Sequence, residues 1–457
     1  MTRAPSPRLR IAFVYDALVP YCSGGAERRF HELATRLADR HDVHQVTWRF
    51  WGGEPTIVRD GVTLHGVGAP RGFYGADGKR TIREASEFAA RLPAVLARIG
   101  ADIVDASATP FLPLYAAWAT TRVTRTPLVA TWHEFWGDHW LDYLPDRPAV
   151  ARAARFVEAT ARSLGDRRVA VSAFTARRMV GTDRGHGWSA EGPGARGGSG
   201  SRQPDRPRDR IDVVANGVDL ETMEAAVPDP ERSDVIYVGR LIDEKRVDLM
   251  IRAVAGLVGR LPSIRCAIVG DGPERAALAA LATDLGVAPN VRFHGRVPDD
   301  RVPSLMRASR ILVLPSAREG YGITVVEGQA CGLVPVVAAS PMSAAPDLVL
   351  DGVDGLVVDP SVEGLATALG GLLEDADRLE RIARAARTSA RDRGWAARAL
   401  EMERVYLEVV EARAGRTAPG ERALRPLPET GGTLEMSGTR AAVSAPDGSA
   451  LVGDPRW

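Results

Sequence analysis

The stretch best suited to chemistry is 316–332, where two carboxylates flank a glycine-containing turn. It follows a short apolar run at 311–314 and opens a helical pattern at 323–331, so we expect it at the carboxyl end of a buried parallel strand, where ligands bind in α/β sheets. Glu319 falls in the loop and Glu327 one turn inside the helix. Each carboxylate can accept two hydrogen bonds, as sugar diols require. The pattern indicates a site for a hydroxyl-rich ligand, unless the two residues are only a helix cap and a solvated glutamate.

Three further features suit a phosphorylated ligand. Gly320 and Gly322 let the backbone approach a ligand closely, and the helix start beside them offers free N–H groups to an anion. Arg240 and Lys245 lie five positions apart in the loop after the run at 234–238, and a guanidinium with an ammonium suits a diphosphate. Lys245 is one of only two lysines among 59 basic residues. The alternative for this pair is a solvated loop face.

A two-glycine loop precedes the first helical pattern of the chain. Gly24 and Gly25 end the loop after an apolar run at 10–15 and lead into the helical pattern at 26–40. They are either an ordinary flexible turn or a loop that faces the same diphosphate from another domain.

Two common motifs fail. The run at 269–275 begins like a dinucleotide-binding fingerprint, but Arg275 stands where the third glycine belongs, and that glycine allows close helix–strand packing. His133 and Glu134 begin like a zinc-binding HExxH motif, but the next histidine is His139, on the opposite side of a helix. We therefore expect neither a dinucleotide site nor a zinc site there.

Composition narrows the class of protein. The 457 residues carry a net charge of +1, which favours neither nucleic-acid binding nor an acidic tail. Three isolated cysteines form no disulfide framework, which is typical of a reducing cytoplasm. The first ten residues lack the apolar core of a signal peptide, and no apolar run has the length of a spanning helix. We expect a cytoplasmic protein.

The elements that must position these residues follow an α/β pattern. Short β-branched runs alternate with amphipathic helical patterns, which indicates parallel sheets covered on both faces. The runs restart after a polar stretch, so we expect two doubly wound domains, 8–218 and 234–394, joined by a linker at 219–233. The strand-like runs lie at 10–15, 43–48, 102–106, 127–130, 168–171, 211–214, 234–238, 265–269, 290–294, 311–314 and 334–338.

Three segments stand outside that alternation. The segment 395–412 has the apolar spacing of one last helix. The segments 181–210 and 413–457 are poor in apolar residues, so we expect a disordered insertion on a loop and a disordered tail.

Seven short blocks follow one another along the chain. They are Val171-Ser-Ala-Phe-Thr, Ala215-Asn-Gly-Val-Asp, Gly239-Arg-Leu with Glu244-Lys245, Ile268-Val-Gly-Asp-Gly-Pro-Glu, Phe293-His-Gly-Arg-Val, the Glu319/Glu327 pair and Gly355-Leu-Val-Val. Each block is weak alone, but in this order they resemble the retaining glycosyltransferases of family 4, over roughly residues 8–412. The resemblance implies a GT-B architecture of two facing Rossmann-like domains with a cleft between them.

The resemblance also implies roles for individual residues. Arg240 and Lys245 match the positions that hold the phosphates of the donor. Glu327 matches the glutamate that binds the ribose hydroxyls, and Glu319 the one that reaches the transferred sugar. His133 matches a histidine beside that sugar, although an ordinary loop histidine is the alternative. The remaining donor contacts implied are Gly24 and Gly25 at the phosphates, Arg296 and Val297 at the base, and the backbone of Gly320, Tyr321, Gly322, Ile323 and Thr324. Helix 395–412 matches the crossover that returns to the first domain.

The implied reaction moves a sugar from a nucleotide-diphosphate sugar to a hydroxyl acceptor with retention. No Asp-x-Asp metal motif follows a strand in the expected way, so we expect no metal and no cofactor, with Arg240 and Lys245 stabilising the leaving phosphate. GDP, UDP and ADP donors all stay open. The acceptor is a glycan, a lipid-linked molecule or a small molecule, and nucleic acid is not expected as a partner.

Three departures from the family pattern stand out. Ala215 replaces a proline, and Arg246 replaces the glycine after Glu-Lys. The segment 341–347 replaces a Gly-Gly loop, and no role is carried over to it. The altered loop keeps open a non-catalytic subunit that only binds a sugar nucleotide, and a sugar-nucleotide epimerase is the other alternative.

One region predicts a peripheral contact with the inner face of a membrane. Aromatic residues concentrate at 131–144, and arginines follow them. Aromatic rings beside cations suit an anionic lipid surface, whereas core aromatics beside a solvated helix face are the alternative. The arginines are Arg147, Arg152, Arg155, Arg162, Arg167 and Arg168.

Overall fold

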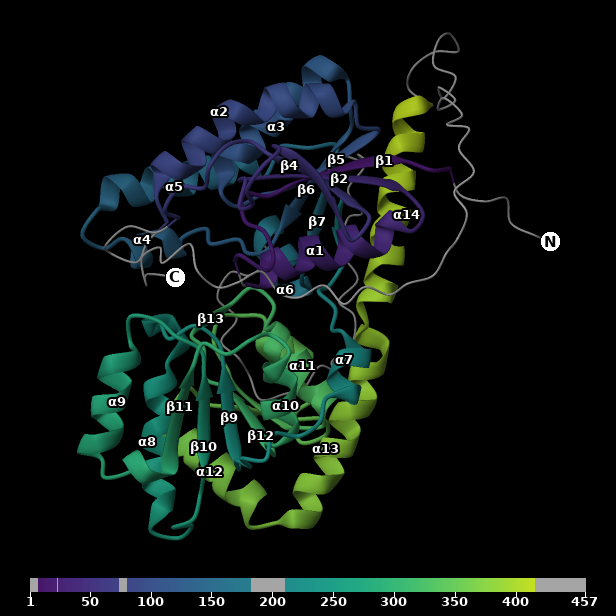
Figure 1. Ribbon diagram of the computed structural model, residues 1–457. Coiled ribbons are helices and arrows are strands. Elements are labelled where there is room, and N and C mark those ends of the chain that lie inside the picture. Colours follow the sequence, from purple (N-terminus) through teal and green to yellow (C-terminus); the bar gives the residue numbers. More distant parts are fainter. Residues whose placement is uncertain (1–6, 23, 74–79, 182–209, 416–457) are drawn as a thin grey trace, which may run out of the picture.

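A computed structural model describes residues 7–22, 24–73, 80–181 and 210–415. Two α/β domains face each other, with a long helix running alongside both (Figure 1). Nearly all of the expected insertion at 181–210 and of the expected tail at 413–457 lies outside the described residues.

The first domain is built on an eight-stranded sheet in the order β3-β4-β2-β1-β5-β6-β7-β8. All pairings are parallel except that of β3 with β4. Helices cover the sheet, as the alternating apolar runs predicted. The strands are β1 (Arg10–Val14), β2 (Asp42–Thr47), β3 (Thr56–Arg59), β4 (Val62–Gly66), β5 (Ile103–Ser107), β6 (Leu128–Trp132), β7 (Arg167–Ala170) and β8 (Ile211–Val213), and the helices are α1 (Gly25–Ala38), α2 (Ile82–Ile99), α3 (Phe111–Thr124), α4 (His139–Tyr143), α5 (Pro148–Ala161) and α6 (Ala173–Val180).

The second domain is built on a six-stranded parallel sheet in the order β11-β10-β9-β12-β14-β16. A separate two-stranded ribbon pairs β13 (Arg318–Glu319) with β15 (Met342–Ser343). The main strands are β9 (Val235–Val238), β10 (Cys266–Val269), β11 (Val291–Gly295), β12 (Ile311–Leu314), β14 (Val334–Ala338) and β16 (Leu356–Val358), and the helices are α7 (Leu220–Ala225), α8 (Val247–Val258), α9 (Arg275–Asp284), α10 (Arg301–Arg307), α11 (Ile323–Cys331), α12 (Val362–Leu373) and α13 (Ala376–Ala390).

The last helix, α14 (Trp395–Ala414), returns to the first domain. Its apolar side chains, including Trp395, Met402 and Tyr406, belong to the core of that domain. The Tyr406 hydroxyl donates to Asp105 of β5 over 2.6 Å. His41, near the start of β2, is 2% exposed and contacts Glu403 of α14 over 3.0 Å. Its position near a strand start would suggest a solvated residue, but it packs beneath a helix that is remote in sequence.

The two connections between the domains lie side by side. Val218 forms an isolated parallel bridge with Gly394, immediately before α14. On the first-domain side, the buried guanidinium of Arg29 donates to the carbonyl oxygens of Val214 over 2.9 Å and Ala215 over 3.0 Å. The connection between the domains, called the hinge below, is therefore held by α1. The exact domain boundaries stay a prediction.

Candidate functional site: the cleft between the domains

The strand order places the candidate residues at one point of the second sheet. β9 and β12 are neighbours, and the order reverses between them, so the loops after these strands leave a crevice at their carboxyl ends. The loop after β9 carries Arg240 and Lys245, and the loop after β12 carries Glu319. The structure therefore brings together three residues that are about 80 positions apart at most.

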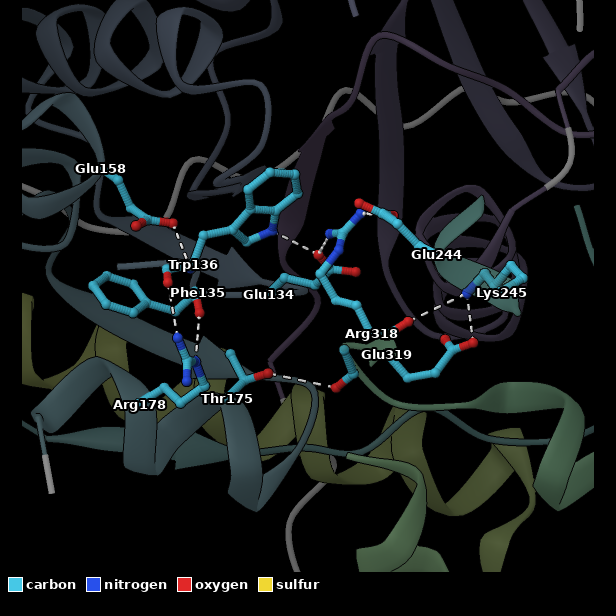
Figure 2. A network of polar contacts seen from close by, with 11 residues as sticks. Glu134, Phe135, Trp136, Glu158, Thr175, Arg178, Glu244, Lys245, Arg318 and Glu319 are labelled. Carbon is cyan, nitrogen blue, oxygen red and sulfur yellow. Dashed lines mark hydrogen bonds and ion pairs between the residues drawn. The ribbon is translucent and has the colours of Figure 1, made fainter. Parts of the chain in front are cut away.

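Lys245 and Glu319 are in direct contact. The Lys245 ammonium donates to Glu319 Oε1 over 2.5 Å and approaches the Arg318 carbonyl oxygen at 3.5 Å (Figure 2). Both side chains are largely covered, at 16% and 15% exposed. Arg240 lies on the exposed side of the same loop. An ammonium has three donors, so Lys245 can keep this carboxylate and still offer a donor to a second anion.

The turn before α11 needs its glycines. Gly322 has φ 93°, a left-handed conformation that favours glycine, and it starts the helix at Ile323. A Cβ at Gly320 would overlap the carbonyl oxygen of His133 in the other domain. The amides of Ile323 and Thr324 belong to the first turn of α11, where no intrahelical acceptor exists. Tyr321 instead packs in the core of the second domain at 6% exposed, so only its backbone is available to a donor.

Glu327 is buried and meets a cation of the first domain. It is 3% exposed and forms an ion pair with Arg28 of α1. Burial raises the pKa of the Glu327 carboxyl, with the Arg28 charge acting against that shift. The same ion pair raises the pKa of Arg28. Nothing in the sequence distinguished Arg28, because a polar residue in the first turn of an amphipathic helix looks like a solvated one.

His133 has a largely covered imidazole beside two aromatic rings. It lies after β6 beside the rings of Tyr15 and Phe30, with centroids at 6.3 Å and 5.8 Å. Burial, with a smaller contribution from the Arg29 charge, lowers its pKa to about 3. Its Nε2 atom is buried and has no hydrogen-bond partner among the described residues. A neutral ring with one unused nitrogen is suited to a hydrogen bond with a ligand hydroxyl.

The remaining predicted contacts lie at the edges of the cleft. Gly24 and Gly25 are exposed at the start of α1, on the side of the first domain that faces the second (Figure 1). Glu27, which follows them, lies close enough to Arg240 for that charge to lower the Glu27 pKa, although burial raises it more strongly. Arg296 is exposed after β11, whereas Val297 packs against the core of the second domain.

The segment 341–347 contacts both the ribbon and the first domain. Its strand β15 pairs with β13, and the Ala344 amide donates to the Glu319 carbonyl oxygen over 2.8 Å. Asp347 forms an ion pair of 2.7 Å with Arg177 of α6. The segment therefore supports the backbone that carries Glu319, a contact that the sequence left open.

The expected cluster of aromatics and arginines is divided by the fold. Trp132 is fully buried, and Arg167 is buried in an ion pair of 2.8 Å with Asp212, so neither can meet a membrane. Exposed apolar side chains remain on α4 and α5 beside exposed arginines. These are Leu141 at 37%, Val150 at 45% and Phe156 at 68%, with Arg147, Arg152 and Arg155. In the part of the chain that the structure describes, no helix is long and apolar enough to cross a bilayer.

Comparison with known proteins decides the family. The profile of the family described as "Glycosyltransferase Family 4" matches residues 23–184, and that of "Glycosyl transferases group 1" matches residues 220–389. The chain belongs to the family 4 glycosyltransferases. The two matched regions correspond to the two domains, one on each side of the cleft.

Two curated relatives illustrate the likeness. A D-inositol 3-phosphate glycosyltransferase of Thermobispora bispora is 34% identical over 47% of this chain and 54% of its own length. A GDP-mannose-dependent alpha-(1-6)-phosphatidylinositol monomannoside mannosyltransferase of Mycolicibacterium smegmatis is 35% identical over 38% of this chain and 49% of its own length. The matches therefore span about half the length of these relatives.

Solved structures share the whole architecture. The sucrose-phosphate synthase of Thermosynechococcus elongatus has a TM-score of 0.70 at 18% identity, covering 89% of this chain and all of its own. HepE of Anabaena, in complex with UDP and glucose, has a TM-score of 0.64 at 21% identity, covering 87% of this chain and 99% of its own. The predicted GT-B fold of two facing Rossmann-like domains is confirmed.

Proposed function

We propose that this family member transfers a sugar from a nucleotide-diphosphate sugar to a hydroxyl acceptor, with retention and without a metal ion. The observation that carries the proposal is the Lys245–Glu319 contact at the switch point of the second sheet, beside the first turn of α11. This contact supports the proposal because it sets an ammonium suited to a diphosphate next to a carboxylate suited to sugar hydroxyls. The relatives named above support a glycosyl transfer, and none of them defines the donor of this chain.

The chemistry requires a charge that grows on the leaving diphosphate to be stabilised as the anomeric bond breaks. Lys245 and Arg240 would supply fixed positive charges to this diphosphate. The amides of Ile323 and Thr324, in the first turn of α11, would add the dipoles of their N–H groups. Glu319 would hold hydroxyls of the transferred sugar. His133, neutral at physiological pH, would donate or accept one hydrogen bond and would not act as an acid.

We propose Glu327 as the residue for the ribose of the donor. The carboxylate is held by Arg28, so a ribose must share it with this guanidinium or displace it. GDP, UDP and ADP all contain the ribose, so this contact does not select the base. Arg296 and Val297 are proposed to lie near the base.

A thermal-shift panel tests donor binding. GDP, UDP, ADP and their sugars are added with and without excess EDTA, because a ligand of the native state raises the melting temperature. We expect one base to give the largest shift, and Glu327→Gln to reduce the shift of every nucleotide in proportion. No shift with any of them would refute the donor site.

For the acceptor, we propose a polyol phosphate or a lipid-linked polyol. The named relatives act on an inositol phosphate and on a phosphatidylinositol mannoside, which supports this class. The exposed side chains of α4 and α5 suit a peripheral contact with an anionic lipid surface.

Flotation with phosphatidylglycerol-rich vesicles tests the membrane contact. The double variant Phe156→Ser with Arg152→Glu should lose binding, whereas Val123→Ser, at an 84% exposed site on α3, should keep it. If the wild type does not bind these vesicles at low salt, the proposed membrane contact is contradicted.

A further inference from the structure

Arg318 joins the two domains at the centre of the cleft. It lies directly before Glu319, and its guanidinium forms ion pairs with Glu134 of the first domain and with Glu244 of the second, the latter at 2.5 Å (Figure 2). The same guanidinium lies over the ring of Trp136, 4.0 Å from its centroid. The Trp136 indole donates to Glu134 over 2.7 Å, so one carboxylate holds both the ring and the cation.

Arg318 and its partner Glu134 are each next in the chain to a residue proposed to contact the sugar. Glu134 follows His133, and Arg318 precedes Glu319. The pair therefore joins the backbone that carries the first-domain histidine to the backbone that carries the second-domain carboxylate. The next residue, Gly320, closes the same gap, because its carbonyl oxygen accepts from Ser172 of the first domain over 2.8 Å.

The first-domain side of this contact is itself held rigidly. Glu158 of α5 accepts from the amides of Trp136 over 2.8 Å and Gly137 over 2.6 Å. Arg178 of α6 donates to the carbonyl oxygens of Phe135 and Trp136, each over 2.8 Å. Arg318 is therefore attached to a first-domain loop that other hydrogen bonds already hold in place.

Burial separates this contact from the Arg177–Asp347 ion pair, which also joins the domains. The Arg318 side chain is 14% exposed, whereas the Arg177–Asp347 pair is exposed at 47% and 41%. An exposed pair contributes little, while removing one partner of a covered network leaves a charge without compensation.

We propose that Arg318 is a positioning residue: held between Glu134 and Glu244, it fixes the separation of His133 and Glu319 and so aligns the donor sugar for transfer. This proposal rests on the proposed function and adds a role that neither residue type nor family motif assigns. Misalignment costs turnover more than affinity, because the nucleotide is bound elsewhere in the cleft.

The experiment compares Arg318→Met, Arg318→Lys and Glu134→Gln with Arg177→Gln as the matched control. We expect Arg318→Met to lower kcat by about 10- to 100-fold, with the KM for the donor and the nucleotide Kd changed less than threefold. Arg318→Lys should recover only part of the lost kcat, since an ammonium lacks the planar guanidinium group that can bind two carboxylates at once. Arg177→Gln should stay within twofold of the wild type.

A readout without turnover accompanies the kinetics. Amide hydrogen exchange in 133–137 should rise in Arg318→Met and stay unchanged in Arg177→Gln, with a single cooperative unfolding transition in each variant showing that the fold persists. Wild-type kcat in Arg318→Met, or equal effects in Arg318→Met and Arg177→Gln, would overturn the proposal. A wild-type protein that transfers no sugar would refute the proposed function, and unchanged exchange in 133–137 of Arg318→Met would then still overturn the positioning role.

Discussion

At the scale of single residues, charge decides what the cleft can bind. Each cation described in detail there already meets a carboxylate: Lys245 meets Glu319, and Arg28 meets Glu327. The proposed donor would therefore have to be accommodated among existing ion pairs. The cost of rearranging them would be part of its binding free energy, and the resulting alignment would be available to the transition state.

Lys245 carries the first prediction. Lys245→Ala should lower kcat by about 10² to 10³, the scale of losing one preorganised electrostatic group, and activity of the wild type should persist in excess EDTA. Lys245→Arg should restore only part, because a planar guanidinium cannot take the position of the ammonium. Initial rates with the donor identified by thermal shift measure this, with the exposed Arg260→Ala as control. Near-normal turnover of Lys245→Ala, or strict dependence on a divalent ion, would contradict the clamp.

His133 carries a prediction about pH. Its folded pKa of about 3 lies below the ordinary value, so the unfolded chain binds a proton below pH 6.5 that the folded protein does not. The free energy of unfolding should therefore fall as the pH drops from 6.5 toward 3, and this contribution is fully present only above 6.5. Between pH 7.5 and 5, the wild type should lose about 2 kcal/mol more than His133→Gln.

Urea denaturation at the two pH values measures that difference. His65→Gln is the matched control, because burial also lowers the pKa of His65, to about 4, far from the cleft. It should remove a similar share of the acid sensitivity without changing the kinetics of transfer. Equal pH dependence in the wild type and His133→Gln would show that His133 is protonated normally in the folded state.

Some residues of the candidate site could be predicted from the sequence and others could not. Glu319, Glu327 and the glycines were visible, because their spacing around a strand end has a local physical meaning. Arg28 and Arg318 were not, since nothing local distinguishes a solvated arginine from one that reaches across a domain gap. Contacts between domains depend on how two folded surfaces meet, which no local pattern records.

At the scale of elements, apolar periodicity predicted the buried parallel strands but not the edge of the first sheet. The β3–β4 hairpin was missed, although Asp60 and Gly61, at φ 50° and 77°, form the kind of turn that joins such strands. Its strands are short and half exposed, so they lack the unbroken apolar run on which the prediction relied. β13 and β15 have two residues each and leave no pattern at all.

The start of α8 carries the third prediction. Arg246, which stands where the family has glycine, adopts φ 48° at the N-cap, a left-handed conformation that costs a non-glycine residue free energy. Arg246→Gly should raise the free energy of unfolding by roughly 0.5 to 1 kcal/mol. This is a net value, because the variant also loses the small contribution of the exposed Arg246–Asp248 ion pair. Arg252→Gly, inside the same helix, should lower it by about 1 kcal/mol. Urea denaturation distinguishes the two, and destabilisation by Arg246→Gly would show that the pair outweighs the strain.

At the scale of the whole molecule, α14 links the two domains. It leaves the second domain at the hinge bridge and packs along the first sheet, where Tyr406 and Glu403 reach Asp105 and His41. Burial raises the pKa of Asp105, and its hydrogen bonds from Tyr406 and Thr131 oppose that shift. The stability of the first domain therefore depends on a helix encoded after the second.

Tyr406→Phe tests that dependence. Removing the hydroxyl leaves the buried Asp105 with Thr131 as its one remaining partner among the described contacts, so the free energy of unfolding should fall by about 1 to 3 kcal/mol. Hydrogen exchange should rise in β1 and β5 and stay unchanged in β9 and β12, because the lost bond lies in the first core only. Tyr115→Phe is the control. Its hydroxyl donates to the part-buried Val157 carbonyl oxygen over 3.1 Å and also contacts the Thr160 hydroxyl, and both partners are neutral and can be satisfied by water, so its cost should stay below about 1 kcal/mol. Equal destabilisation by the two variants, or faster exchange in the second sheet of Tyr406→Phe, would mean that α14 does not stabilise the first domain through this bond.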